Sequence, residues 1–169
     1  YYRQVEQKND KIKIVYWKKE FNYSAINNFG VQYASGDYLL FLNNDTEIIN
    51  ADCIEEMLGY CQREDVGAVG ARLYYPDETI QHAGVVIGVG GTAGHIYLNT
   101  PRGQIGYFAG IICAQDYNAV TAACMMTKKE LFEKVGGFEE KLAVAYNDVD
   151  YCLKIRDEKK LVVYNPFAE

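Results

Sequence analysis

Short runs of apolar residues alternate along the chain with stretches whose apolar residues follow helical spacing. The apolar run 38–42 is continuous, as is typical of a strand buried on both faces of a parallel sheet. Extended segments of this kind predict strands over residues 13–17, 38–42, 66–74, 80–87, 120–126 and 161–164. Helical spacing predicts helices over residues 24–34, 53–61, 128–135 and 145–159. This alternation predicts an α/β sandwich with a mostly parallel central sheet.

Signals at the ends of segments sharpen two of the predicted helices. Asp52, with Glu55 three residues later, is a favourable N-cap for the second helix. Thr127 and Glu130 have the spacing of a capping box at the start of the third. Residues 88–110 are rich in glycine and lack periodicity, and so long an irregular segment in a compact domain is usually functional or mobile.

Composition narrows the class of protein. At 169 residues, 49% hydrophobic and 24% charged, the chain fits a single globular domain that covers residues 1–169. It has no apolar run of the ~18 residues that a membrane span needs and no signal-peptide pattern. The net charge of −6, without a cluster of Lys and Arg, argues against nucleic acid as a partner. A nucleotide diphosphate would therefore need a metal ion or a few local cations to bind.

The five cysteines form no C-x-x-C pair, and their number is odd. All except Cys113 lie in apolar segments. Buried free thiols in a reducing cytosol are the interpretation that this pattern favours over disulfides or a metal site.

A polar triplet, Asn43-Asn44-Asp45, directly follows the apolar strand 38–42. Ligands of open α/β sheets bind at the carboxyl ends of strands, so an Asp here could bind a hard cation that bridges two phosphates. The alternative is a simple turn or helix cap.

Two further acids lie in Asn147-Asp148-Val149-Asp150, at a predicted helix start. They serve either as helix caps or, through Asp148, as a general base. Residues one apart point to different sides of a helix, so one of the two acids at most faces a site.

The Gly-rich stretch 88–95 lacks the Lys-Ser/Thr of a phosphate-binding loop and does not open a helix, which favours a flexible loop. His82 and His95 could act as ligands or acid/base groups, or occupy surface or satisfied positions.

The order of several sequence blocks resembles the family 2 glycosyltransferases, and most strongly the bacterial rhamnosyltransferase-like branch that builds surface polysaccharides. The resemblance covers residues 20–167. The blocks are residues 21–30, 34–47, 67–74, 80–84, 119–124, 136–138 and 146–153. It implies a GT-A-like (Rossmann-like) α/β/α sandwich that lacks its first strands.

The resemblance also implies roles for individual residues on the donor side. The triplet occupies the family's D-x-D position, where Asp45 would bind Mn²⁺ or Mg²⁺ on the donor diphosphate. Asn43 replaces the first Asp, which removes one charge from the site. With Asn28 and Asn44, these residues form the expected nucleotide-sugar site.

On the acceptor side, the family's E-D pair corresponds to Asn147 and Asp148, which makes Asp148 the catalytic base. Thr121, Ala122 and Asp150 are expected to line the same side. The implied reaction is inverting: Asp148 takes the proton of an acceptor hydroxyl as that hydroxyl attacks the anomeric carbon. The metal would neutralise the leaving diphosphate.

The expected partners are a nucleotide-diphosphate sugar and a saccharide or lipid-linked acceptor. The expected location is the cytoplasm, including the inner face of a bacterial membrane, with peripheral membrane contact through regions outside this chain. Family members carry two earlier strands and a later His, so we expect residues 1–169 alone to bind nucleotide poorly and to be inactive. The alternatives are a non-catalytic saccharide- or nucleotide-binding relative and a nucleotidyltransferase, which would require a basic N-terminal phosphate loop.

Overall fold

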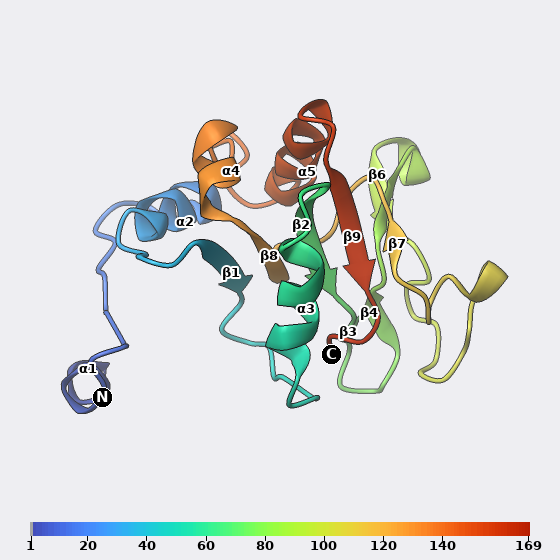
Figure 1. The fold of residues 1–169 in the computed structure, drawn as a ribbon, viewed down its shortest axis with the longest axis horizontal. Helices are drawn as coiled ribbons and strands as arrows, with labels where there is room; N and C mark the ends of the chain where they lie inside the picture. The colour runs from blue at the N-terminus through green and yellow to red at the C-terminus, as the bar shows by residue number, and fades with distance from the viewer. Residues whose placement is uncertain (1) are drawn as a thin grey trace.

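The computed structural model describes residues 2–169 and is built around a mixed five-stranded sheet with the order β1-β8-β2-β9-β7 (Figure 1). The strands are β1 (Tyr38–Leu42), β2 (Val66–Ala71), β7 (Gln115–Asp116), β8 (Cys124–Lys128) and β9 (Leu161–Asn165). The predicted strands 38–42 and 161–164 are confirmed, and the strand predicted over 120–126 starts later, at Cys124.

The prediction of a mostly parallel sheet is wrong. Only the β2–β9 pairing is parallel, whereas β8 runs antiparallel to both β1 and β2, and β7 runs antiparallel to β9. Strands β7 and β8 therefore both run opposite to β2 and β9, and residues 117–123, which connect them, contain no helix. Because β8 lies between β1 and β2, β1 is an edge strand, and its carboxyl end lies beside the start of β8, with Leu42 opposite Cys124.

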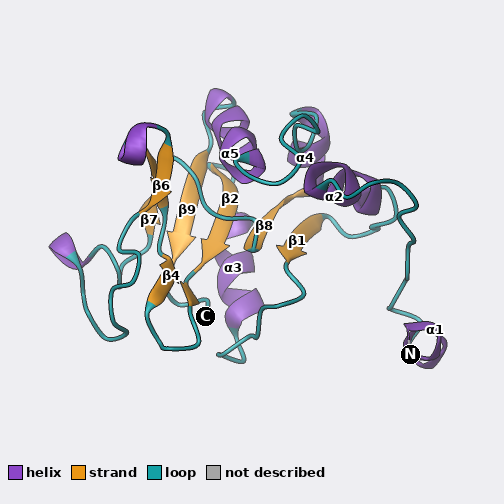
Figure 2. Ribbon diagram, turned by 180° about the vertical axis from the view of Figure 1, so that it is seen from behind, coloured by secondary structure: helices purple, strands orange, loops and turns teal. Residues whose placement is uncertain are grey.

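Helices cover both faces of the sheet, which confirms the α/β/α sandwich (Figures 1 and 2). One face carries α2 (Tyr23–Val31), α4 (Lys129–Lys134) and α5 (Asn147–Asp157), and the other carries α3 (Cys53–Cys61). The short helix α1 (Tyr2–Lys8) lies apart from these layers in both views.

A group of aromatic side chains forms the core beneath α4 and α5. Phe41 of β1 lies 5.2 Å from Phe132 and 4.8 Å from Phe138, measured between ring centroids. Tyr151 of α5 completes the group at 5.3 Å from Phe138. Burial of each such side chain contributes about 1.5–3 kcal/mol, so this face fixes α5 firmly against the sheet.

Glycine divides the predicted strand 80–87 into β4 (Ile80–His82) and β5 (Val85–Ile87). Gly84 has φ +111°, and a Cβ at this position would lie 2.2 Å from the ring of Tyr117. The predicted strand 66–74 is likewise divided, because β3 (Leu73–Tyr74) pairs with β4 outside the main sheet. The Gly-rich region contributes β6 (Ala93–His95), which pairs with β5.

Two other local predictions are wrong. Residues 13–17 belong to no strand of the described chain, since Trp17 instead packs on Phe29 of α2 at 5.5 Å. Thr127 is not a cap but a buried residue of β8, where its hydroxyl donates to the carbonyl of Gly67 and meets the Tyr151 hydroxyl at 2.8 Å. Burial of that hydroxyl between strand and helix outweighs the capping geometry.

Asp52 precedes α3 as predicted, although its side chain makes no capping hydrogen bond. The remaining helix predictions hold, with α2, α4 and α5 shorter than expected. All five cysteines are free, and all except Cys113 are buried, as predicted.

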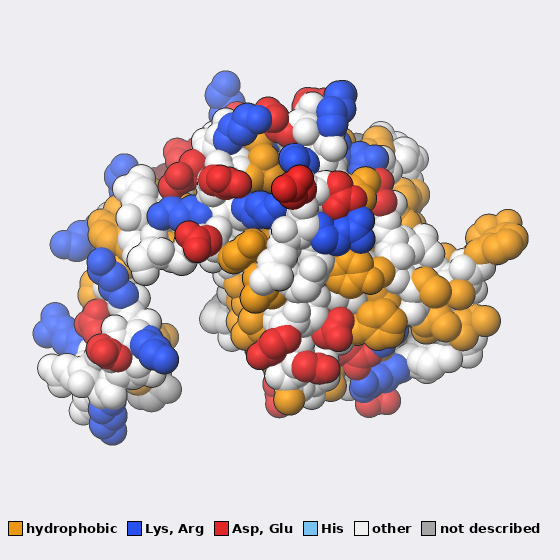
Figure 3. All heavy atoms as spheres, in the orientation of Figure 1, with side chains coloured by type: hydrophobic (Ala, Val, Ile, Leu, Met, Phe, Trp, Pro, Cys, Tyr) orange, Lys and Arg blue, Asp and Glu red, His pale blue; other side chains and the backbone are white. Residues whose placement is uncertain are grey.

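The region 88–110 also contains two 3₁₀ turns, η1 (Val89–Gly91) and η2 (Tyr107–Ala109). At η2, Tyr107 and Phe108 are 78% and 84% exposed, and hydrophobic side chains project from this edge of the molecule in Figure 3. Within residues 2–169, no helix has the length and apolar character needed to cross a bilayer.

Candidate active site

The short segment 119–123, which leads into β8, makes backbone contacts with five separate parts of the chain. Its hydrogen-bonding partners outside the segment are Tyr23, Asn43, His82, Val85, Asp148 and Cys152. This segment therefore joins α2, the end of β1, β4, β5 and the start of α5 at one place. Because the bonds use main-chain atoms, the geometry depends on the path of the backbone more than on side chains.

Asp148 lies in the first turn of α5 and is held by backbone donors. The amide of Ala122 donates to Oδ2 at 3.2 Å, and that of Val149 donates to Oδ1 at 2.8 Å. Asn147 is buried, accepts from the Asp148 amide at 2.8 Å and donates to the carbonyl of Leu142 at 3.2 Å. The Asn at this position thus orients the start of α5, a role that an amide can fill with both donor and acceptor.

The triplet forms a tight turn at the end of β1. The backbone amide of Thr46 donates to the carbonyl of Asn43 at 3.3 Å, and its hydroxyl donates to the same oxygen at 2.6 Å. Asn43 is half-buried, while Asn44 and Asp45 are exposed. The amide of Asn43 donates to the carbonyl of Ala123 at 2.9 Å, so the turn is anchored to segment 119–123.

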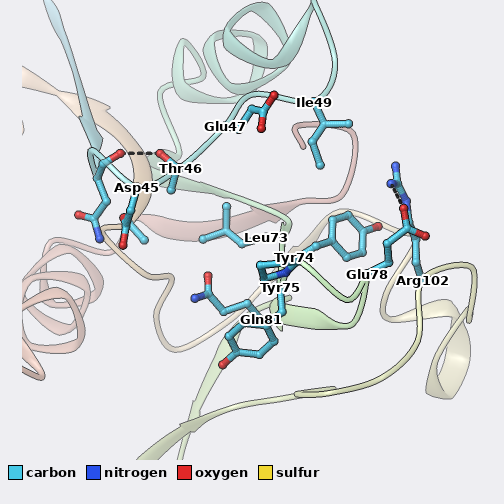
Figure 4. A pocket seen from close by; sticks show the side chains of 13 residues that line it. Asp45, Thr46, Glu47, Ile49, Leu73, Tyr74, Tyr75, Glu78, Gln81 and Arg102 are labelled. Atoms are coloured by element: carbon cyan, nitrogen blue, oxygen red, sulfur yellow. Dashed lines mark hydrogen bonds and ion pairs between the residues drawn. The ribbon is translucent and has the colours of Figure 1, made fainter.

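A cavity of about 580 Å³ opens on the side of Asp45. Figure 4 shows Asp45 and Thr46 at one side, Glu78 and Arg102 at the other, and aromatic side chains between them. Its lining also includes Asn43 and Ala123, which connect it to the segment that holds Asp148.

Tyr23 of α2 bridges the two sides of the site. Its hydroxyl lies 3.1 Å from the carbonyl oxygen of Ala122 and 3.4 Å from Oδ1 of Asn43. Burial, and secondarily the negative charge of Asp148, raises the pKa of Tyr23 to about 12. The phenol therefore stays protonated and acts as a hydrogen-bond donor at neutral pH.

The two histidines meet beside segment 119–123. Nδ1 of His82 lies 2.9 Å from Nδ1 of His95, and the amide of Thr121 donates to Nε2 of His82 at 3.4 Å. His82 is fully buried and His95 is half-buried. Both ring nitrogens of His82 have hydrogen-bonding partners, as in the satisfied position that one of the sequence interpretations proposed, whereas His95 bonds through Nδ1.

Desolvation governs the charge of the pair. It holds the pKa of His82 well below its usual value, and the neighbouring His95 lowers that pKa further. Burial also lowers the pKa of His95, while the carboxylate of Asp148 acts in the opposite direction. Both rings are therefore neutral near pH 7.

Two predicted site residues make other contacts. Asn28 donates to the carbonyl of Phe138 at 2.9 Å and accepts from its amide at 3.0 Å, which joins α2 to the loop after α4. Asp150 pairs with Lys154 one turn along α5 at 2.8 Å. Within residues 2–169, no hydrogen bond or ion pair joins Asn28 or Asp150 to segment 119–123, whereas Asn43 bonds to Ala123 and Asn147 to Asp148, which Ala122 holds.

The chemistry of the pocket fits a hard divalent cation in part. The carboxylate of Asp45 is exposed and has no hydrogen-bonding or ionic partner within residues 2–169. The same residues contain no group of three or more His, Cys, Asp or Glu side chains that could hold a metal alone. Mg²⁺-type sites commonly combine one or two carboxylates with substrate phosphates, so Asp45 fits as the protein ligand of such a shared site.

These features define an α/β domain with a cavity at the carboxyl end of β1, and the chain belongs to glycosyl transferase family 2. The family's description matches residues 1–136, which include the Asn43–Asp45 turn and end before Asp148. The resemblance seen in the sequence is thereby confirmed.

Two curated relatives support this assignment. The chain is 45% identical over 170 residues to the uncharacterized protein y4gI of Sinorhizobium fredii, and 42% identical over 148 residues to the O-antigen biosynthesis protein RfbC of Myxococcus xanthus. These matches cover 100% and 87% of the chain but only 19% and 12% of the two relatives. The chain thus spans less than a fifth of either protein.

Solved structures establish the fold as GT-A. The mannosyltransferase PcManGT from Pyrobaculum calidifontis, in complex with GDP-Man and Mn²⁺, aligns with a TM-score of 0.67 at 14% identity over 98% of this chain and 41% of its own. GalNAc-T7 with UDP, GalNAc and Mn²⁺ aligns with a TM-score of 0.74 at 11% identity over 97% of this chain and 32% of its own. At these identities the similarity concerns the fold.

Sequence reasoning missed the long-range contacts that join the parts of the candidate site. Tyr23 lies in a block that resembles the family, but nothing in its local pattern predicts a bond to Ala122, 99 residues away. His82 lies in another such block, and its pairing with His95 depends on β4 and β6 being brought together. Glu78 and Arg102, at the edge of the cavity, carry no local signal either.

Proposed function

We propose that the protein containing this chain transfers a sugar from a nucleoside-diphosphate donor to a hydroxyl of a saccharide or lipid-linked acceptor, with inversion at the anomeric carbon. The main support for this proposal is the arrangement of two acids around segment 119–123. Asp45 lines an open cavity, and Asp148 is held by the Ala122 amide. The name of the RfbC relative supports bacterial surface polysaccharide synthesis, with the reaction in the cytoplasm or at the inner face of the membrane.

In this proposal the donor diphosphate occupies the cavity beside Asp45. A bound Mn²⁺ or Mg²⁺ would be held by Asp45 and the phosphates, and would supply Lewis-acid neutralisation of charge on the leaving group. Asn43 and Asn44 provide amides, in place of charge, at the same turn. The net charge of −6 makes this compensation necessary, because Arg102 is already paired with Glu78 and Glu169.

Asp148 acts as the general base. The acceptor hydroxyl gives its proton to a carboxylate oxygen of Asp148 while its own oxygen bonds to the anomeric carbon. The bond between that carbon and the phosphate oxygen breaks in the same displacement, and the nucleoside diphosphate leaves with the electron pair. One displacement inverts the configuration, and no covalent intermediate on the protein is required.

The test uses the full-length protein, because the chain spans only 19% and 12% of the two curated relatives. Uridine, thymidine and guanosine diphosphate sugars are supplied with and without Mn²⁺, and release of nucleoside diphosphate is followed for wild type, Asp45→Asn and Asp148→Asn. Metal-dependent turnover of one donor, lost in both variants, supports the proposal, and an anomeric configuration opposite to that of the donor supports inversion. Donor binding without turnover, unchanged in both variants, would instead support a non-catalytic binding protein.

A further inference from the structure

The His82–His95 pair has a defined hydrogen-bond direction. The amide of Thr121 can only donate, so Nε2 of His82 accepts and carries no proton. A neutral imidazole then carries its proton on Nδ1, and this proton lies on the 2.9 Å contact with Nδ1 of His95. His95 must accept there, which places its own proton on Nε2.

The Nε2–H of His95 is not used by the protein. Among residues 2–169, the only hydrogen-bond partner of the His95 ring is His82. The ring is half-buried, at the end of β6. The geometry therefore leaves one oriented donor exposed at this place.

The His95 ring lies close enough to the start of α5 for the charge of Asp148 to act on its pKa. Thr92, three residues before His95, contacts the hydroxyl of Tyr146 at 3.1 Å, two residues before Asp148. Thr121, bonded to His82, is followed by Ala122, whose amide donates to Asp148. Two independent connections thus bring the pair to the catalytic carboxylate.

We propose that His82 and His95 are positioning residues of the transfer reaction, with His95 donating its Nε2–H to an oxygen of the saccharide acceptor beside Asp148. His82 fixes the tautomer of His95 and, through Thr121, the peptide that orients Asp148. The inference rests on the proposed function and extends it to recognition of the acceptor.

The neutral state of the pair is part of this arrangement. Among the described residues, the titratable groups that face the pair from other elements are Asp148 on α5 and Tyr164 on β9, whose ring lies 6.3 Å from that of His82. A proton added to Nδ1 of His95 would oppose the Nδ1–H of His82 and break the 2.9 Å contact, and a proton added to Nε2 of His82 would oppose the amide of Thr121.

The experiment compares His95→Leu with His95→Gln in the full-length protein, using the sugar donor identified in the panel. Gln keeps an N–H near the position of Nε2, so its rate of nucleoside diphosphate release should stay within about threefold of wild type. Leu should lower the rate about tenfold or more while the affinity for the donor with Mn²⁺ is unchanged. A Leu variant as active as wild type, or a Gln variant as impaired as the Leu variant, would overturn the proposal.

The pH profile separates positioning from simple structural support. As the pH falls, protonation of the pair should lower wild-type kcat/KM. In His95→Gln the fall should be less steep, because position 95 no longer gains a proton. Equal slopes in the two proteins would contradict the assigned role.

Histidine NMR keeps the inference testable if no donor is turned over, an outcome that would defeat the proposed function itself. The ¹⁵N spectrum should show His82 protonated at Nδ1 and His95 at Nε2. Asp148→Asn should lower the pKa of His95, since it removes the opposing negative charge. The opposite tautomers, or an unchanged pKa, would overturn the proposed positioning role whatever the activity.

Discussion

The surroundings of Asp148 and of Asp45, on the two sides of segment 119–123, differ in how many hydrogen bonds the protein makes to each carboxylate. We call the Asp148 side the completed side and the Asp45 side the open side. On one side, both carboxylate oxygens of Asp148 accept backbone hydrogen bonds, and Asn147 beside it is buried. On the other, Asp45 lies in an exposed turn and has no partner within the described chain. The fold therefore prepares the proposed base in advance, whereas the proposed donor site is completed only by its ligand.

The largest effect is expected at the completed side. Asp148→Asn should lower turnover about 100-fold or more, because an amide cannot accept the proton. Donor affinity, measured by calorimetry with Mn²⁺, should stay the same, since the cavity is lined by other residues. Asp157→Asn, an exposed acid at the end of the same helix, is the matched control and should leave turnover unchanged. Loss of donor binding in Asp148→Asn would contradict the assignment of catalysis to Asp148 and of donor binding to the Asp45 side.

At the open side, a change should affect binding and not folding. Asp45→Asn should weaken Mn²⁺-dependent donor binding about tenfold, as expected for removal of a charged metal ligand. Its free energy of unfolding should stay within about 0.5 kcal/mol of wild type, because no protein group depends on the carboxylate. Calorimetric titrations with and without Mn²⁺, beside thermal unfolding, measure both quantities. A large loss of stability would mean that this side, too, is built into the fold.

Acid should lower the free energy of unfolding through protonation of His82, which packs on the completed side. Its pKa is lowered in the folded state, so the unfolded chain binds more protons below its ordinary value of about 6.5. Stability should therefore be constant above that pH and fall as the pH drops through it, by at most about 1.4 kcal/mol per pH unit for this group.

Urea unfolding at intervals from pH 7.5 to 5 measures this dependence. His82→Gln should flatten the curve between pH 6.5 and 5, although the variant starts less stable. A wild-type curve that is flat over this range would contradict the buried neutral pair.

The smallest expected effect concerns the bridge between the sides. Tyr23→Phe removes the donor shared by Ala122 and Asn43, and should cost about 1 kcal/mol of unfolding free energy. Turnover should fall by only a few-fold, since the backbone bond from Asn43 to Ala123 remains. Tyr33→Phe, at an exposed position after α2, is the control for loss of a hydroxyl. Equal effects of the two substitutions would show that the Tyr23 hydroxyl has no special role in the candidate site.

The spacing of apolar residues predicted the elements whose buried residues repeat at regular intervals within the element itself. Helix α3 repeats apolar contacts at Cys53, Met57 and Cys61, a spacing visible in the sequence. Strand direction depends on distant pairing instead. The apolar run 38–42 has the pattern of a central parallel strand, yet it forms an antiparallel edge because β8 is inserted between β1 and β2.

The sequence predicted the two acids of the candidate site, but it did not predict the contacts that link the parts of the site. Asp45 and Asp148 follow from their positions at a strand end and a helix start, and from resemblance to the family. The contact between His82 and His95 spans two hairpins, and no local property of either residue encodes it. The interpretation of the glycine-rich stretch as a flexible loop missed β6, whose pairing with β5 carries His95 into place.

The reliance of segment 119–123 on main-chain bonds has a consequence for how this enzyme family can diversify. In the proposed reaction, a mutation there changes the volume and polarity that the acceptor meets without removing the main-chain bonds to Asp148 and Asn43. Thr121 and Ala123 are partly exposed and so open to such change, while Ala122 is 2% exposed and closely packed. Under the proposed function, acceptor preference can therefore change while the backbone bonds around the site stay the same.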